Sequence, residues 1–302
     1  MKLGRLGVWS ANDRLTPPEI ARLLRTAEDL GYCALWYPEA VGYEALSSAA
    51  FMLANSTTLS IGSSIASTYA RDAFTARRGM LGLNQMFGDR FILGLGVSHA
   101  NMVQARGHGY DRPVPAMKAY LDQLYADEAG AADWPVMLAA LGPVMMKLAF
   151  ARSQGALPVN TTPDHTRLAA ASMAPGKHLA VAQKFLFTTD ASHARAIGRA
   201  ELAMHLAMPN YINHFLRMGF APAELENGGS DRLIDALITW GPVDEVKRRI
   251  RAHFDAGATH VLPPPHRGND QSPHRRCQIS GSSLPCKPTS SGLMKHNSVP
   301  AH

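Results

Sequence analysis

The residues best suited to chemistry stand where predicted strands end, and they are aromatic or small rather than charged. Trp9 closes the first predicted strand, Trp36 lies near the end of the second, and Gly94 and Gly96 lie near the end of the fourth. Two indoles could wall a flat heteroaromatic ring, and glycines without a Cβ could let that ring approach the backbone. We therefore predict a site for a flat cofactor, with Trp9 and Trp36 shaping the substrate face as catalytic residues. The alternative is that both tryptophans are core residues.

His99 follows the same glycine-containing stretch, Gly94-Leu95-Gly96-Val97-Ser98. An imidazole titrates near neutral pH, so His99 could donate a proton to a substrate or contact the cofactor. The alternative is an ordinary loop histidine. The stretch is not the dinucleotide-binding glycine fingerprint, because it follows the fourth strand and has no third glycine.

Two predicted helices begin in a way that suits an anion. Gly142 precedes Pro143 at one helix start, and Thr161 and Thr162 precede Pro163 at the next. Free N–H groups at a helix N-terminus, together with the helix dipole, bind phosphate groups. Either start could be a plain N-cap, but two neighbouring ones favour a phosphate-bearing cofactor.

Metal-dependent and hydrolytic chemistry find little support. The three cysteines form no CxxC pair, and neither GxSxG nor HExxH occurs. Five further histidines show no metal-ligand spacing, and we expect them on surfaces or in helix packing: His165, His178, His193, His205 and His214. We predict no metal site.

The charge distribution argues against a nucleic-acid partner. The net charge is +6, but +4 of it lies in the last 37 residues, which leaves a nearly neutral body. The chain contains no apolar run long enough to span a membrane, and its first residues, MKLGRLGVW, do not resemble a signal peptide. We expect a cytoplasmic protein without a membrane partner.

These residues must be positioned by alternating strands and helices. Eight short apolar runs predict strands at 2–9, 33–37, 58–66, 90–94, 135–139, 156–160, 179–188 and 259–262. Amphipathic segments predict helices at 17–30, 45–54, 73–87, 114–125, 144–152, 163–172 and 242–256, and residues 191–218 exceed one crossover helix. The pattern is typical of a (β/α)8 TIM barrel with a helical insertion before the last strand, whose active site lies at the carboxyl ends of the strands.

The C-terminal segment has a different composition. Residues 263–302 are rich in Pro, Ser and His and show no apolar periodicity, so we expect an irregular, disordered tail. Residues 1–262 form the predicted barrel domain. A standard barrel would place its eighth helix in the tail region.

Several longer stretches resemble the bacterial luciferase-like superfamily, and within it the coenzyme F420-dependent oxidoreductases of actinobacteria. The stretches that carry this resemblance are LTPPEIARLLRTAEDLGYCALWYPEA, IGSSIASTYARDAFTARRGMLGLNQMFGDRFILGLGVSHA, VMLAALGPVMMKLA, MPNYINHFLRMGF and GSDRLIDALITWG. The resemblance covers about residues 1–262. It implies a TIM barrel with the deazaflavin lying in its mouth.

The resemblance also implies roles for individual residues. Glu39 matches an acidic residue that contacts the ring system, and Ser64-Ile65 matches a non-prolyl cis peptide that bulges against the ring. His99 stands where relatives place a proton donor or a cofactor contact. The backbone segment that holds the cofactor phosphate corresponds to Ala140, Leu141 and Gly142, with Thr161 and Thr162 as the alternative anion site. Ala40 replaces the catalytic histidine of sugar-phosphate dehydrogenases, which argues against that activity.

The resulting hypothesis is an F420-dependent oxidoreductase that transfers a hydride between the deazaflavin and an unidentified small organic substrate. One alternative is an FMN-dependent luciferase-like monooxygenase. A second is a non-catalytic cofactor-binding relative. We expect a homodimer.

Overall fold

A computed structural model describes residue 1 and residues 3–126 and 129–265. Nine of its strands form one sheet: β1 (Gly7–Trp9), β2 (Ala34–Tyr37), β3 (Ser60–Ser63), β4 (Ala66–Ser67), β5 (Phe91–Gly96), β6 (Val136–Leu138), β7 (Gly155–Ala156), β8 (His178–Ala182) and β11 (His260–Leu262). Two more, β9 (Lys184–Leu186) and β10 (Ile238–Trp240), pair with each other.

The large sheet closes into the predicted barrel. Its order is β1-β2-β3-β5-β6-β7-β8-β11, all pairs are parallel, and the short β4 adds to β5. A parallel bridge between Leu6 and Val261 joins the first strand to the last. Most strands are shorter than predicted; the first begins at Gly7 rather than at residue 2.

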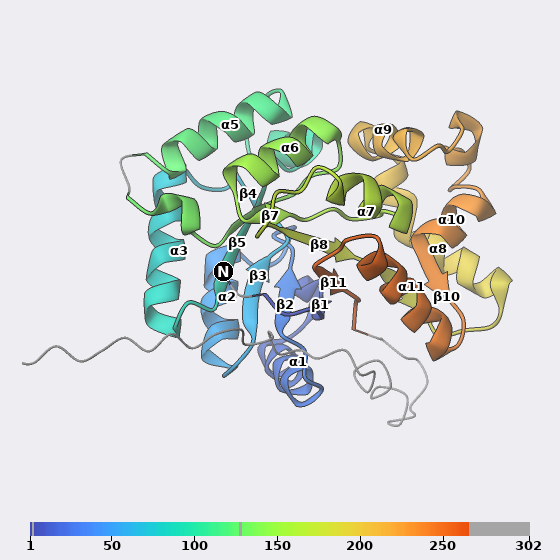
Figure 1. The fold of residues 1–302 in the computed structure, drawn as a ribbon, viewed down its shortest axis with the longest axis horizontal. Helices are drawn as coiled ribbons and strands as arrows, with labels where there is room; N and C mark the ends of the chain where they lie inside the picture. The colour runs from blue at the N-terminus through green and yellow to red at the C-terminus, as the bar shows by residue number, and fades with distance from the viewer. Residues whose placement is uncertain (2, 127–128, 266–302) are drawn as a thin grey trace, which may run out of the picture.

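Helices surround this barrel (Figure 1). They are α1 (Pro17–Asp29), α2 (Ala45–Ala54), α3 (Ala73–Phe87), α4 (Ala100–Gln104), α5 (Pro113–Leu124), α6 (Pro143–Arg152), α7 (Pro163–Ala170), α8 (Ala191–Leu206), α9 (Pro209–Arg217), α10 (Asp231–Leu237) and α11 (Val243–Asp255). Three short 3-10 turns, η1 (Asn12–Arg14), η2 (Ala131–Asp133) and η3 (Pro222–Leu225), link them.

Local signals account for the helix ends. At the start of α1 the Glu19 carboxylate accepts a 2.8 Å hydrogen bond from the Thr16 amide, which is one half of a capping box. Asp72 caps α3 by accepting from Thr75 N at 2.8 Å, and Gly88 ends that helix in the left-handed region at φ 66°.

The barrel interior is filled by large apolar side chains, as in other (β/α)8 barrels. Trp36 is fully buried there, and its Nε1 donates a 3.1 Å hydrogen bond to Nε2 of His260. A Cβ on Gly62 would lie 2.4 Å from the Trp36 ring, so the glycine makes room for the indole.

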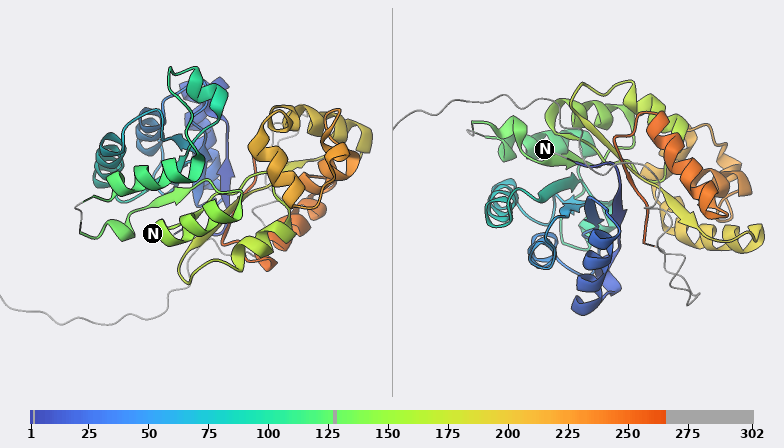
Figure 2. Two further views of the ribbon diagram at one scale, coloured as in Figure 1. Left: turned by 90° about the horizontal axis from the view of Figure 1, so that it is seen from above. Right: turned by 60° about the horizontal axis from the view of Figure 1, so that its bottom comes forward.

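The insertion, residues 184–240, lies on one side of the barrel (Figures 1 and 2). It has its own core, which includes Phe215, Leu233 and Ile234. The insertion is less purely helical than predicted, because the predicted strand 179–188 divides at Gln183 and β9 turns away to pair with the unpredicted β10. The buried Gln183 side chain secures this divergence by donating to the Leu237 carbonyl at 3.2 Å.

The described chain ends just beyond β11. Pro263, which we had assigned to the tail, accepts a 3.0 Å hydrogen bond from Trp9 N through its carbonyl oxygen. The barrel pairing therefore extends one residue beyond the predicted boundary. The remainder of the predicted tail from residue 266 lies outside the described residues.

Candidate active site

An uncharged floor lies at the carboxyl ends of the barrel strands. It consists of Trp9, Ile65, Ala139 and Ala182, each only partly buried and each at or just beyond a strand end. Trp9, Ile65 and Ala182 pack directly on the barrel core. Small and flat side chains that carry no charge make a surface suited to a flat aromatic ring.

Trp36 does not belong to this floor. It is fully buried, and its indole is hydrogen-bonded to His260. The prediction that Trp36 shapes the substrate face is therefore wrong, and the alternative of a core residue holds. Of the two tryptophans, only Trp9 reaches the mouth.

The two glycines of β5 serve the protein's own packing. A Cβ on Gly94 would lie 1.9 Å from the Ser63 carbonyl oxygen, and one on Gly96 would lie 2.7 Å from Cγ1 of Ile65. The space that we had predicted for a cofactor is thus occupied by neighbouring protein atoms. These glycines allow the Ile65 side chain to lie against the strand.

The Ser64–Ile65 peptide bond is cis, which confirms the prediction made from the resemblance. Ser64 N donates to the Tyr37 carbonyl at 2.6 Å, and the Ile65 carbonyl accepts from Glu39 N at 3.1 Å. Both residues are thereby tied to the loop that follows β2.

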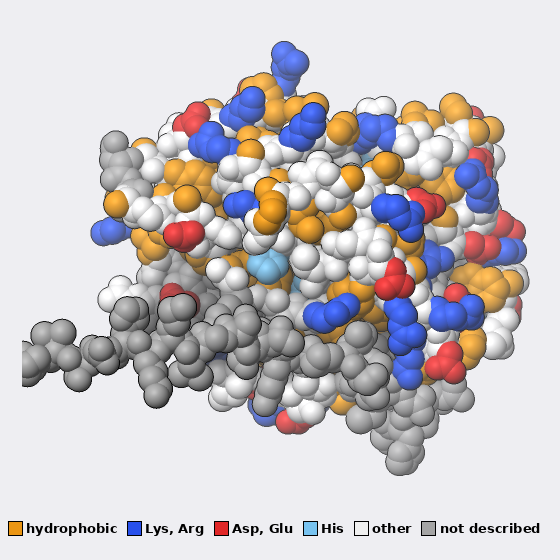
Figure 3. Space-filling view, in the orientation of Figure 1, with side chains coloured by type: hydrophobic (Ala, Val, Ile, Leu, Met, Phe, Trp, Pro, Cys, Tyr) orange, Lys and Arg blue, Asp and Glu red, His pale blue; other side chains and the backbone are white. Residues whose placement is uncertain are grey.

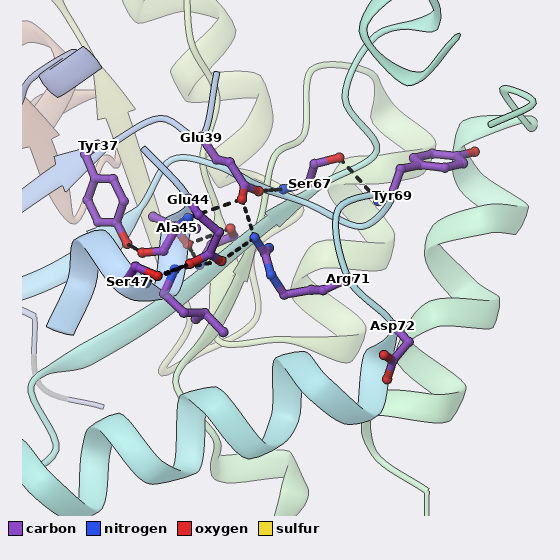
Figure 4. Close-up of polar contacts among 12 residues, drawn as sticks. Tyr37, Glu39, Glu44, Ala45, Ser47, Ser67, Tyr69, Arg71 and Asp72 are labelled. Carbon is purple, nitrogen blue, oxygen red and sulfur yellow. Dashed lines mark hydrogen bonds and ion pairs between the residues drawn. The ribbon is translucent and has the colours of Figure 1, made fainter. Parts of the chain in front are cut away.

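Glu39 is held from several sides within the protein (Figure 4). Its carboxylate accepts from Ser67 N at 2.8 Å and from Ala45 N at 3.2 Å, and it forms an ion pair with Arg71. Arg71 also pairs with Glu44 at 2.7 Å. Both oxygens of Glu39 are therefore engaged by protein groups, and the structure shows this residue fastening the Ile65 loop rather than presenting a free carboxylate to the mouth.

His99 follows β5 and is the residue before α4. The insertion reaches it there: the Tyr211 ring centroid lies 5.7 Å from the imidazole centroid, and the Asn210 side chain is hydrogen-bonded to His99. Burial lowers the pKa of His99 below 6.5, and the Asn210 hydrogen bond partly offsets this effect. Helix α9 thus covers an imidazole that the sequence alone placed in an open loop.

The two anion-capable helix starts lie at one corner of the mouth. Nε2 of His165 donates to the Leu141 carbonyl at 3.3 Å, and His165 N donates to the Thr162 hydroxyl at 3.3 Å. His165 therefore links the start of α6 to the start of α7. Ala140 is buried, three residues before Pro143, and the corner follows directly from the floor residue Ala139.

We call this place the α6–α7 corner. Besides Gly142, Thr161 and Thr162 it includes Asn160, His165, His214 and Arg217. A Cβ added to Gly142 would have Arg217 Nη2 as its nearest neighbour, at 3.5 Å. The His165 and His214 ring centroids are 4.7 Å apart, and Nε2 of His214 donates to the Asn160 carbonyl at 3.1 Å.

Several buried polar atoms of the corner have no hydrogen-bond partner among the described residues. They are Nδ2 and Oδ1 of Asn160, Nδ1 of His165 and Nδ1 of His214. Asn160 is only 3% exposed and has a φ of 51°, and His214 is fully buried. Buried polar groups are normally satisfied, so the corner holds hydrogen-bonding capacity that the described residues do not use.

Asn160, His214 and Arg217 were not among the predicted site residues. The expectation that His214 takes part in helix packing agrees with the structure, where the side chain is fully buried on α9. One signal was available. Asn210, His214 and Arg217 follow an i, i+4, i+7 spacing, which places them on one face of α9. Which residues this face of α9 contacts depends on how the insertion docks against the barrel.

Within the described ranges, no group of three or more His, Cys, Asp or Glu side chains is arranged to hold a metal ion. No helix in this part of the chain is both long and apolar enough to cross a bilayer. On the face drawn in Figure 3, Lys and Arg side chains lie scattered, with Asp and Glu side chains among them.

Comparison with known proteins agrees with this architecture. The luciferase-like monooxygenase profile matches residues 2–260. A 5,10-methylenetetrahydromethanopterin reductase of Methanolobus tindarius is 24% identical over 290 residues, which cover 81% of this chain and 89% of the relative.

Two solved structures share the fold. The coenzyme F420-dependent tetrahydromethanopterin reductase of Methanopyrus kandleri aligns with a TM-score of 0.69 at 17% identity, covering 94% of this chain and 99% of that chain. The oxygenating constituent of the 3,6-diketocamphane monooxygenase of Pseudomonas putida, in complex with FMN, aligns with a TM-score of 0.61 at 12% identity, covering 87% and 93%. Because the family profile spans most of the sequence, the chain belongs to the luciferase-like monooxygenase family.

Proposed function

We propose that this protein is an oxidoreductase that binds coenzyme F420 and transfers a hydride between it and a small organic substrate. The observation that carries the proposal is the continuity of two surfaces. The uncharged floor leads within three residues, from Ala139 to Gly142, into a corner rich in unpartnered polar atoms. F420 has two corresponding parts, an uncharged flat ring and a polar arm that carries a phosphate.

The residues present fit such a cofactor. Trp9, Ile65 and Ala182 would support the ring, and Glu39 and Ser64 would hold the Ile65 bulge in place. The phosphate would lie at the start of α6, beside Ala140, Leu141 and Gly142, with the Thr161 and Thr162 hydroxyls at the neighbouring helix start. When bound, F420 supplies a carbon centre that accepts or donates hydride.

His99 is the proposed proton donor. Its half-buried imidazole lies just beyond the end of β5, and Asn210 and Tyr211 of α9 cover it. A donor in this position can protonate a substrate atom while α9 limits access by water. Trp9 would form the substrate side of the floor.

A side-by-side titration of the purified protein with F420 and FMN tests the proposal. We expect tight binding of F420, seen as a change in deazaflavin fluorescence, and binding of FMN at least tenfold weaker. Preferential binding of FMN would instead favour the monooxygenase alternative, for which the shared fold of the FMN-bound diketocamphane monooxygenase is the supporting observation. Binding without turnover of any reducible or oxidisable substrate would favour a non-catalytic relative.

Two further expectations belong to this proposal. The partner is a small-molecule substrate rather than a macromolecule, and the protein is a cytoplasmic homodimer. Light scattering of the purified chain measures its oligomeric state, and a monomeric mass over the working concentration range would contradict the homodimer.

A further inference from the structure

We propose that the substrate of this protein carries a carboxylate, and that Lys184 binds this group where the insertion meets the barrel mouth. The proposal rests on the proposed function, because it concerns the substrate of the same active site. It adds the chemical class of that substrate, a small organic acid with one negative charge. We call the residues that carry the argument the seam cluster: His99, Lys184, His205 and Tyr211.

Lys184 is the first residue of β9, just beyond the point where β8 and β9 diverge. Side chains alternate along an extended chain, so Lys184 and the floor residue Ala182 project to the same side. Gln183 between them points away, because its side chain is hydrogen-bonded to His253 and to the Leu237 carbonyl. The Lys184 side chain is 23% exposed. It is therefore a partly buried cation beside the floor that a ligand can still reach.

Three other members of the seam cluster surround this cation. The Tyr211 ring at the start of α9 contacts two imidazoles, with centroid distances of 5.7 Å to His99 and 4.6 Å to His205 at the end of α8. Burial, the charge of Lys184 and, to a smaller extent, that of His99 lower the pKa of His205 to about 4. The cluster thus brings Lys184 to the same side of the mouth as the proposed proton donor His99.

The charge of Lys184 is only weakly compensated within the described part of the chain. The carboxylate that pairs with it belongs to Glu201, at 3.8 Å, and the Glu201 side chain is 61% exposed. A long ion pair with a solvated carboxylate contributes little. Burial lowers the pKa of Lys184 below 10.5 even though Glu201 acts in the opposite direction. A partly buried ammonium group without a close counter-charge favours an anionic ligand.

The number of charges indicates which anion fits. His205 is neutral at neutral pH, because its pKa is about 4, so Lys184 is the permanent cation of the seam cluster. One positive charge suits a carboxylate better than a doubly charged phosphate monoester. Helix α9 begins at Pro209, and the positive end of its dipole adds to the attraction. An acid bound at Lys184 would have its uncharged part over the floor, on the side of His99.

The test compares benzoate with benzamide, two probes of similar size and shape that differ in charge. Dissociation constants are measured by isothermal titration calorimetry on the full-length chain, both free of cofactor and saturated with F420. Lys184→Met removes the cation, Lys184→Arg retains it, and Glu201→Gln removes the competing carboxylate. Lys247→Met is the matched control, because Lys247 on α11 is 34% exposed and pairs with Asp244 at 3.9 Å.

We expect the unmodified protein to bind benzoate at least tenfold more tightly than benzamide. Lys184→Met should weaken benzoate at least tenfold and leave benzamide within twofold, whereas Lys184→Arg should weaken benzoate less than threefold. Glu201→Gln should strengthen benzoate at least twofold, and Lys247→Met should change neither probe.

Two results would overturn the proposal. The first is equal binding, or no binding, of the two probes by the unmodified protein. The second is an unchanged benzoate affinity of Lys184→Met in protein with an unchanged near-UV circular dichroism spectrum, or a loss of benzoate affinity in Glu201→Gln.

The failure of the proposed function has a different signature. If the protein does not bind F420 but the cofactor-free chain binds benzoate in a way that depends on Lys184, the carboxylate site stands and the F420 assignment fails. If F420 binds but benzoate affinity does not depend on Lys184, the proposed function stands and the carboxylate site fails.

Discussion

At the scale of single residues, His99 is the side chain whose protonation decides the proposed chemistry. Burial lowers its pKa below 6.5, so the protonated form needed for proton donation is lost as the pH rises through that lowered value. We expect His99→Gln to reduce turnover about 100-fold or more, the usual contribution of a general acid, with little change in cofactor affinity.

Asn210 provides a separate check on His99. Its hydrogen bond favours the charged imidazole, so Asn210→Leu should lower the pKa of His99 further and shift the alkaline limb of the turnover profile to lower pH. Turnover of the two proteins is compared across pH 4.5 to 8. An alkaline limb that does not move, or that moves to higher pH, would show that His99 is not the group whose titration limits turnover.

Gly142 tests the placement of the phosphate. Its φ of −94° is allowed for any residue, so Gly142→Val should leave the fold intact. The branched side chain would enter the space beside Arg217, and we expect F420 affinity to fall at least tenfold, about 1.4 kcal/mol. Unchanged F420 affinity in a folded variant would indicate that the phosphate lies at Thr161 and Thr162 instead.

At the scale of elements, the barrel strands depend on a buried contact between β2 and β11. Trp36→Phe would remove the donor to His260 and leave a void beside Gly62, which should lower the free energy of unfolding by about 2–4 kcal/mol. Because Trp36 is fully buried, cofactor affinity should change less than twofold. Urea unfolding measures the free energy of unfolding, and a fluorescence titration measures cofactor affinity. A large loss of affinity with normal stability would show that Trp36 belongs to the substrate face.

At the scale of the whole molecule, buried histidines make stability depend on pH. Burial lowers the pKa of His253 to about 3 and that of His260 to about 4. Between pH 6.5 and these values the unfolded chain binds protons that the folded chain does not, so the free energy of unfolding falls as the pH falls. Each such histidine contributes a slope of up to about 1.4 kcal/mol per pH unit.

His253→Gln tests this dependence. The amide can retain contacts with Thr166 and Gln183, which His253 joins at 2.9 and 2.8 Å, but it does not titrate. Urea unfolding between pH 5 and 7 should show a smaller slope for the variant than for the unmodified protein. An equal slope would mean that His253 takes up its proton without unfolding.

Patterns along the chain were sufficient to predict the barrel and the positions of most elements, because these depend on short-range features of the sequence. Alternation of buried runs and amphipathic segments predicted the eight barrel strands and the helix that begins at Pro17. The resemblance added the Ser64–Ile65 cis peptide, which no pattern of propensity would have indicated.

Only the tertiary structure decided which side chains meet at the mouth. Trp9 and Trp36 look alike in the sequence and are register partners on neighbouring strands, yet Trp36 is fully buried and Trp9 is only partly buried. His214 and Arg217 are distant in sequence from Gly142, Asn160 and His165, and they join these residues only because the insertion docks α9 against the starts of α6 and α7. Such contacts depend on the packing of the whole insertion, which residue types and spacing along the chain do not encode locally.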